Sequence, residues 1–232
     1  MKYPRTYHLP FSPGSTNDDK KLKKNKWFEN FRGKEVVITE KLDGENIHMD
    51  QHDCYARSDG ESTRSPWTKN IWSPSNGLYW RIQSLIEPNE IIFGENLYGE
   101  HAIHYDKLTS YFHIFGVVGL SKEEPQSQIF YSWDDITKKA KMLELPTAPV
   151  IYEGKIDSEA HLKKIIDETM KLPSAYGTTK EGIVMRIKDS FKFEDFPKYV
   201  CKWVRPNHVQ TEIHWTKNFK RADLINNNYV YY

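Results

Sequence analysis

Short strand patterns recur along this chain and limit the folds open to it. From residue 35 onward, runs of β-branched and aromatic residues are bounded by Gly, Pro, Asn or Asp, which predicts strands separated by turns. The expected strands cover residues 36–40, 46–50, 54–57, 91–96, 112–120, 128–131, 182–188 and 199–204. Because these strands come in runs rather than alternating with helices, we expect an antiparallel sheet.

Helix patterns are fewer than strand patterns. Residues 77–87 place Leu78, Ile82 and Leu85 on one stripe and end before Pro88, as an amphipathic helix does. Ser132 and Ser158 are typical N-caps for two further helices, which we expect to run to about residues 142 and 170. The sequence therefore predicts an α+β domain in which helices flank an antiparallel sheet.

The length of 232 residues is typical of one generous domain that can bury a core without disulfides or metal. We expect residues 1–34 to form an N-terminal arm, residues 35–206 the domain itself, and residues 207–232 a short tail of the same domain. The arm would pack on the domain through Tyr3, Tyr7, Leu9 and Phe11. Residues 58–76 are expected to form a long functional loop.

The overall charge offers no argument for a nucleic-acid partner, since 33 Lys and Arg face 32 Asp and Glu. A local basic run occurs at residues 20–26, which contain five lysines and precede Trp27 and Phe28. Two interpretations stay open for this run. It is either a solvated surface, as charge runs usually are, or a contact for a phosphate backbone with aromatic rings beside it.

Two cysteines, Cys54 and Cys201, exclude a disulfide framework and a multi-cysteine zinc site. Both lie in apolar surroundings, so we expect buried free thiols. The chain has neither an apolar run near the ~18 residues of a membrane span nor the apolar core of a signal peptide. We therefore expect a cytoplasmic, monomeric protein in a reducing compartment, without a membrane partner.

A lysine follows the predicted strand at 36–40, at the start of the run Lys-Leu-Asp-Gly-Glu-Asn. Lys41 would leave a dry sheet and enter a cleft, where an uncharged amine is a nucleophile. Its unperturbed pKa near ~10.4 keeps it charged, and Glu40, Asp43 and Glu45 favour that charge. A divalent cation would neutralise the acids. Taken alone, this run also fits a surface turn with an ion pair.

Residues 41–46 resemble motif I of the covalent nucleotidyltransferase superfamily, which contains ATP-dependent RNA and DNA ligases and mRNA capping enzymes. Further segments follow in the order of that family. Arg57 ends the next hairpin, Phe-Gly-Glu-Asn at 93–96 resembles motif III, and Tyr-Phe-His-Ile-Phe at 111–115 resembles motif IIIa. Glu-Gly-Ile-Val-Met-Arg at 181–186 and Tyr-Val-Cys-Lys-Trp at 199–203 are similar to motifs IV and V.

The resemblance implies an ATP-grasp-like ligase adenylation domain, and it assigns roles to single residues. Lys41 would attack ATP to form a lysyl-AMP, with Glu181 and Lys202 as further catalytic residues. Phe115 would stack on adenine. The implied nucleotide contacts are Glu40, Lys41, Asn46, Arg57, Glu95, Phe115, Glu181, Lys198 and Lys202.

The resemblance also implies Mg²⁺ or Mn²⁺, held by Glu181, Glu95 and Asn46 directly or through water. Strand alternation after residue 198 would place Lys198 and Lys202 on one face, which makes Lys198 the candidate second cation of motif V. Contacts to RNA phosphates are expected from Arg64, Lys69, Arg205 and His208.

Within the superfamily, Asn46 resembles RNA-repair ligases, whereas DNA ligases commonly have arginine there. Only 27 residues follow Arg205, which leads us to expect a compact form without an OB-fold domain. The expected activity is ATP-dependent RNA ligation, in which AMP passes to an RNA 5′-phosphate and a 3′-hydroxyl then displaces it. A DNA ligase, another polynucleotide-activating nucleotidyltransferase and an inactive RNA-binding module stay open as alternatives.

Overall fold

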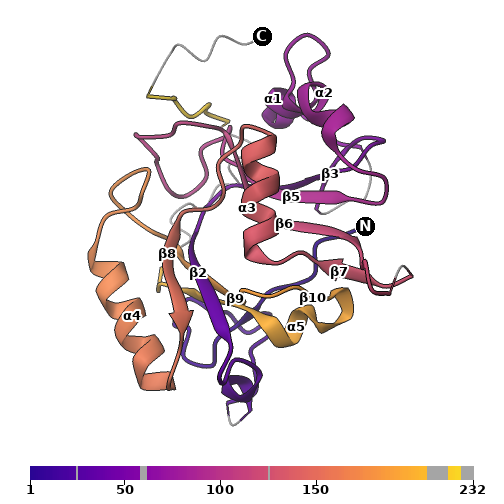
Figure 1. The fold of residues 1–232 in the computed structure, drawn as a ribbon. Coiled ribbons are helices and arrows are strands. Elements are labelled where there is room, and N and C mark those ends of the chain that lie inside the picture. Colours follow the sequence, from indigo (N-terminus) through magenta and orange to yellow (C-terminus); the bar gives the residue numbers. More distant parts are fainter. Residues whose placement is uncertain (25, 58–61, 125, 208–218, 226–232) are drawn as a thin grey trace.

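The computed structural model describes residues 1–24, 26–57, 62–124, 126–207 and 219–225. Its strands form two sheets, in the orders β1-β11-β9-β2-β8 and β10-β7-β6-β5-β3-β4. In Figure 1 the strands β3, β5 and β6 run across the direction of β2 and β8. Apart from the parallel pair β1–β11, the pairs of strands within both sheets are antiparallel. The predicted α+β class is therefore confirmed.

The bounds of the strands agree closely with the sequence patterns. The first sheet contains β1 (Tyr7–His8), β11 (Val200–Val204), β9 (Gly182–Ile187), β2 (Glu35–Lys41) and β8 (Val150–Lys155). The second contains β10 (Phe191–Lys192), β7 (Gln128–Phe130), β6 (Phe112–Leu120), β5 (Ile91–Asn96), β3 (Glu45–Met49) and β4 (Cys54–Ala56). Three of these strands were not predicted: β1 and β10 have only two residues each, and the edge strand β8 lacks a buried face.

The three predicted helices are present. The segment 77–87 forms α2 (Leu78–Ile82), which continues as the short 3₁₀ helix η3 (Gln83–Leu85). Ser132 caps α3 (Trp133–Met142) and Ser158 caps α4 (Glu159–Lys171), because each hydroxyl accepts a hydrogen bond from the backbone N–H three residues later. Both predicted N-caps are confirmed.

Shorter helical segments complete the structure. They are η1 (Trp27–Asn30), η2 (Pro66–Thr68), α1 (Lys69–Trp72), η4 (Phe193–Asp195) and α5 (Phe196–Tyr199). The first part of the long segment 58–76 includes residues 58–61, which lie outside the described residues. The described helices include none with the length and hydrophobicity of a membrane span.

Strand β2 lies in the core with both faces covered. Val36 and Ile38 are fully buried in a cluster that includes Leu162 and Ile166 of α4, while Val37 points into a second cluster with Ile92. Alternating side chains of one strand thus join two cores. Burial of both faces therefore fixes the position of β2, which ends at Lys41. Both cysteines of the chain are also buried and free, as predicted.

Replacing Ile38 by alanine should lower the free energy of unfolding by about 2–5 kcal/mol, because the buried side chain leaves a cavity in a strand that cannot collapse onto it. Urea titration would measure the change. Val150→Ala is the matched control, since Val150 lies on the edge strand β8 and is 46% exposed. Similar losses for both variants would contradict this account of the core.

Candidate active site

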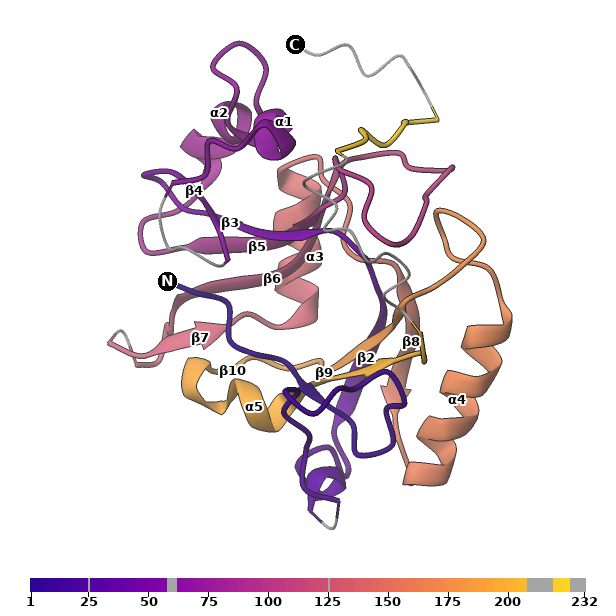
Figure 2. The same cartoon turned by 180° about the vertical axis from the view of Figure 1, so that it is seen from behind.

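A pocket of about 880 Å³ lies where the two sheets and the N-terminal arm meet. Both sheets contribute lining residues, and so does the segment from Lys2 to Thr6. Figure 2 shows this segment crossing from the side of β6 and β7 toward β9. The sequence-predicted site residues that line the pocket are Glu40, Lys41, Asn46, Arg57, Glu95, Phe115 and Lys202.

The ammonium of Lys41 is bound to a carboxylate from the neighbouring strand. Lys41 ends β2 and stands opposite Gly182 of β9, so the preceding residue, Glu181, reaches across. Nζ donates a hydrogen bond to Glu181 Oε2 at 2.5 Å, and the two side chains are 23% and 7% exposed. The strand pairing thus brings together two residues that are 140 positions apart.

Two pKa values in this group are shifted. Burial acts to lower the pKa of Lys41, but the carboxylates of Glu181, Glu95 and Asp43 outweigh it, so the pKa is raised. Burial raises the pKa of Glu95 to about 7, against a smaller lowering effect of Lys41 and with a further rise from Glu181. Without a ligand, the resting state of Lys41 is therefore the charged amine.

The turn after Lys41 is fastened to the second sheet. Gly44 N–H donates to Glu95 Oε1 at 3.1 Å, and a Cβ at this position would collide with the backbone of Asn96. Asp43 Oδ2 accepts hydrogen bonds from the N–H groups of Ala102 and Ile103, both at 2.9 Å. The Asp-Gly pair thus orients Lys41, and the carboxylate of Asp43 is engaged in the loop.

Asn46 of β3 and Arg57, the residue after β4, both line the pocket. Asn46 is paired with Glu95 across β3 and β5, and its buried Oδ1 has no hydrogen-bond partner among the described residues. Arg57 is exposed, and its N–H donates to the carbonyl of Asn46 at 3.1 Å. A buried acceptor without a partner at a pocket wall indicates that a bound group supplies one.

The donor atoms fit a hard divalent cation in part. Glu181, Glu95 and Asn46 offer oxygen ligands, which Mg²⁺ and Mn²⁺ prefer. Within the described residues, no cluster of three or more His, Cys, Asp or Glu side chains could hold a metal ion alone. A cation here would thus depend on phosphate oxygens and water for its other ligands, as Mg²⁺ in nucleotide sites commonly does.

Phe115 projects into the pocket from an irregularity in β6. The pairing of β5 with β6 shifts between Phe93 and Gly94, so that Phe115 has no partner in the ladder. Such a bulge re-aims a side chain. Val184 of β9 lines the same pocket from the other sheet. An aromatic ring from one sheet and an aliphatic side chain from the other provide apolar surfaces for a planar base.

Glu40 also borders the pocket, but its carboxylate is bound to protein donors. Ser174 Oγ–H donates closely to one oxygen and the N–H of Ala175 donates to the other at 3.0 Å. Burial raises the pKa of Glu40, and these hydrogen bonds together with Lys180 act in the opposite direction. The carboxylate fastens the segment after α4 to β2.

Lys202 lines the pocket from β11, whereas Lys198 does not share its strand, so the predicted common face is wrong. Lys198 lies in the helical turn α5, is 60% exposed and binds Asp195 at 2.6 Å. The helical turn arises because Pro197 suits its first residues, so strand alternation begins only at Val200. Burial, followed by the charge of Lys41, lowers the pKa of Lys202.

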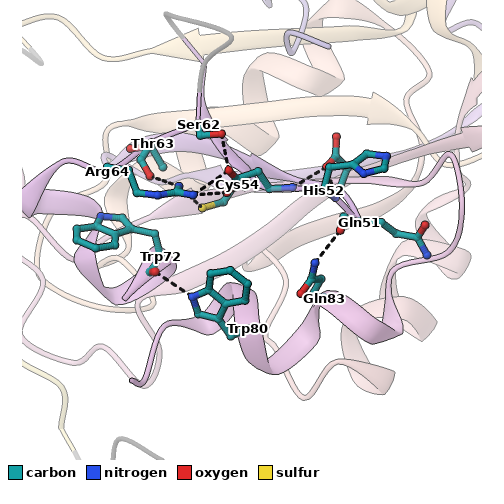
Figure 3. Close-up of polar contacts among 11 residues, drawn as sticks. Gln51, His52, Cys54, Ser62, Thr63, Arg64, Trp72, Trp80 and Gln83 are labelled. Carbon is teal, nitrogen blue, oxygen red and sulfur yellow. Dashed lines mark hydrogen bonds and ion pairs between the residues drawn. The ribbon is translucent and has the colours of Figure 1, made fainter. Parts of the chain in front are cut away.

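The predicted RNA contacts are spread over the structure. Arg64 binds Asp53 at 2.8 Å, and Figure 3 shows it beside Cys54 and Thr63. Lys69 begins α1, and neither residue lines the pocket. The backbone of Arg205 is bound to Glu181, and its Nε and Nη2 are buried without partners among the described residues. His208 lies outside the described residues.

Residues of the N-terminal segment, Tyr3, Arg5 and Asp19 among them, line the pocket without having been predicted there. The ring of Tyr3 lies 5.0 Å from that of Phe115, edge to face. Arg5 Nη2 lies 3.6 Å from Asp19 Oδ1. Hydrogen bonds from Thr16 and the charges of His8 and Lys202 outweigh burial and lower the pKa of Asp19 to about 2. The aromatic residues of the arm predicted packing, but not the location of the contact.

Comparison with known structures places this fold among nucleotidyltransferase-type ligases. A Naegleria gruberi RNA ligase variant with ATP and Mn aligns at a TM-score of 0.56 and 16% identity, over 88% of this chain and 56% of that chain. An archaeal ATP-dependent RNA ligase aligns at 0.54 and 16%, over 88% and 48%. A putative ATP-dependent DNA ligase from Aquifex aeolicus aligns at 0.53 and 19%, over 88% and 50%.

The RNA ligase family model matches residues 34–204, and the chain belongs to this family. The family resemblance of the sequence is therefore confirmed. The chain spans between about half and three-fifths of the length of the similar structures. A comparison with curated proteins found no significant match.

Glu95→Gln should flatten the pH dependence of stability. The folded-state pKa of about 7 exceeds the ordinary 4.5, so between these values the folded protein retains a proton that the unfolded chain releases. The contribution of Glu95 to the free energy of unfolding therefore falls as pH rises, by about 1–3 kcal/mol in total. Thermal melts of the ligand-free protein from pH 4.5 to 8 would measure it.

Glu194→Gln is the control, because Glu194 is exposed on η4. This control should keep the slope of the wild-type protein. If the Glu95 variant also retains that slope, the buried carboxyl does not titrate as described.

Proposed function

We propose that this protein is an ATP-dependent RNA ligase that acts through a covalent lysyl-AMP at Lys41. The observation that carries the proposal is the position of Lys41 at the pocket. Glu181 binds its ammonium there, and Lys202 interacts with it electrostatically. Membership of the RNA ligase family supports it. The similar Naegleria gruberi ligase with ATP and Mn is consistent with the proposed cofactors.

In the first step, the Lys41 amine attacks the α-phosphorus of ATP. A nitrogen–phosphorus bond forms, the bond to the bridging oxygen breaks, and pyrophosphate leaves with the electron pair while the amine loses its protons to solvent. Covalent catalysis divides one difficult transfer into easier steps. Phe115 and Val184 hold the adenine in this proposal, and Arg57 and Glu95 contact the ribose or phosphate.

The developing negative charge must meet cations in place. Lys202 is assigned to the α-phosphate, and its lowered pKa reflects burial and the neighbouring charge of Lys41. A divalent cation held by Glu181, Glu95 and Asn46 would offset the carboxylate charge that keeps Lys41 protonated. The hydrogen bonds of Asp43 and Gly44 orient the turn that follows Lys41, and with it the amine.

In the later steps, AMP passes from Lys41 to the 5′-phosphate of an RNA end, and a 3′-hydroxyl attacks that activated end and releases AMP. Lys41 returns to its pair with Glu181. Sealing assays on nicked duplexes test this part of the proposal: joining that needs a ribose 3′ end supports RNA ligation, whereas equal joining of all-DNA nicks would favour a DNA ligase.

Wild-type protein incubated with radiolabelled ATP and a divalent cation should carry label, and Lys41→Ala should carry none, because no other amine is held against Glu181 at the pocket in the described part of the chain. Denaturing gel electrophoresis measures the label. Lys164→Ala is the control, since Lys164 is 73% exposed on α4. Label that persists in the Lys41 variant, or label from GTP alone, would contradict the proposal.

Arg5 replaces Lys198 as the proposed second cation. Arg5 borders the pocket, and its guanidinium donates to the carbonyl of Asp18 at 2.6 Å and lies near Asp19. Asp19 is in turn coupled electrostatically to Lys202. Arg5, Asp19 and Lys202 thus form one connected group at the pocket. We assign this part of the pocket to the departing pyrophosphate.

Arg5→Ala should slow lysyl-AMP formation from ATP by about 10- to 100-fold, since a half-exposed cation that meets leaving-group charge is partly screened. Sealing of RNA that already carries a 5′-AMP should be unchanged, because no pyrophosphate leaves in that step. Single-turnover assays measure both rates. Arg32→Ala, which alters an exposed arginine paired with Glu29, is the control. Equal losses in both steps would indicate that Arg5 only stabilises the fold.

A further inference from the structure

The lysine run at residues 20–26 lies beside the strand that carries Lys202. His8 of β1 is paired in parallel with Lys202 on one side and with Lys21 on the other. Backbone hydrogen bonds of 2.8 Å join His8 N–H to the carbonyl of Lys20, and Leu22 N–H to the carbonyl of His8. Lys202, His8 and Lys21 therefore stand in one row across three neighbouring chain segments.

The row sets the distance between the pocket and the lysine run. Adjacent paired strands lie about 4.8 Å apart, and residues paired in parallel strands point to the same face. Lys21 is thus about 10 Å from Lys202 along the sheet, which is close to one Debye length at physiological salt. A single polyanion can interact with both.

The charges of this run face solvent. All five lysines, Lys20, Lys21, Lys23, Lys24 and Lys26, are exposed. Acids on this side form ion pairs outside the run: Asp19 with Arg5 and His8, Glu29 with Arg32, and Glu159 with Lys163, although the charge of Lys24 also acts on Glu159. The ammonium of Lys20 also lies 5.5 Å from the ring of Tyr7.

One exposed acid, Asp18, lies near the start of the run. Its single charge does not balance five lysines. The segment is therefore a strongly basic edge, continuous with the Lys202 end of the pocket.

We propose that the surface formed by Lys20, Lys21, Lys23, Lys24 and Lys26 binds the phosphates of the RNA strand whose 5′ end receives AMP. The inference rests on the proposed function, because it assumes that this 5′-phosphate reacts at the α-phosphate beside Lys202. An RNA strand that extends from Lys202 across β1 meets Lys21 first and then the other lysines. The contacts are to the backbone, so they do not depend on base sequence.

The test compares three variants: Lys20→Ala/Lys21→Ala/Lys23→Ala, the same three positions changed to Arg, and the control Lys138→Ala/Lys141→Ala/Lys164→Ala. The control lysines are exposed on α3 and α4. The probe is a single-stranded RNA with a 5′-AMP, and fluorescence anisotropy measures its dissociation constant over a series of KCl concentrations. The Lys41 labelling assay, with ATP alone, is run in parallel on every variant.

The alanine variant of the run should bind the RNA more weakly. The slope of log K against log salt should fall by about 2, because each phosphate of a single strand that a lysine neutralises contributes about 0.7 to the slope. The arginine variant and the control should keep the wild-type slope. ATP labelling should be unchanged in all three, since none of the lysines changed lines the pocket. Retained labelling also shows that the alanine variant is folded.

Three results would overturn the inference: an unchanged slope in the alanine variant, the same fall in the control, or competition by polyglutamate of equal charge as effective as RNA, which would indicate a surface for acidic protein. Failure of the proposed function is seen separately. If wild-type protein takes no label from ATP, the lysyl-AMP mechanism is wrong, whatever the salt slopes of the variants.

Discussion

The ion pair between Lys41 and Glu181 is the contact on which the site depends. It forms because β2 and β9 are paired such that the end of one strand faces the beginning of the other. A charge in this partly dry position is stable only with its partner, and removal of one leaves the other uncompensated. The same pair sets the proton state of the amine, which a bound cation would change.

The position of Lys41 also depends on the second sheet. The turn that follows it is bound through Asp43 to Ala102 and Ile103, and through Gly44 to Glu95. These contacts join the end of β2 to β5 and to the loop after it. A shift between the sheets would therefore move Lys41, because the acidic, Gly-containing turn beside it is bound to both.

The N-terminal segment completes the pocket as a third wall. Its pairing with β11 fixes it next to Lys202, and Tyr3 packs against the rings of Phe93 and Phe115. The residues that match the RNA ligase family begin only after most of this arm. Nevertheless, the arm contributes a guanidinium and a carboxylate to the pocket and connects it to the basic run.

The sequence by itself determined the α+β class, most strands, both serine N-caps and the order of motifs that contains Lys41, Glu95 and Glu181. These features are local, since periodicity, caps and turn residues act over a few positions. Lys198 was misplaced because the helical turn at Pro197 interrupts the strand period. Only the tertiary structure decided that Phe115 sits on a bulge, that Asp43 binds a distant loop, and that Tyr3 and Arg5 reach the pocket. Contacts of this kind depend on strand order and pairing between segments far apart in the chain, which no local pattern specifies.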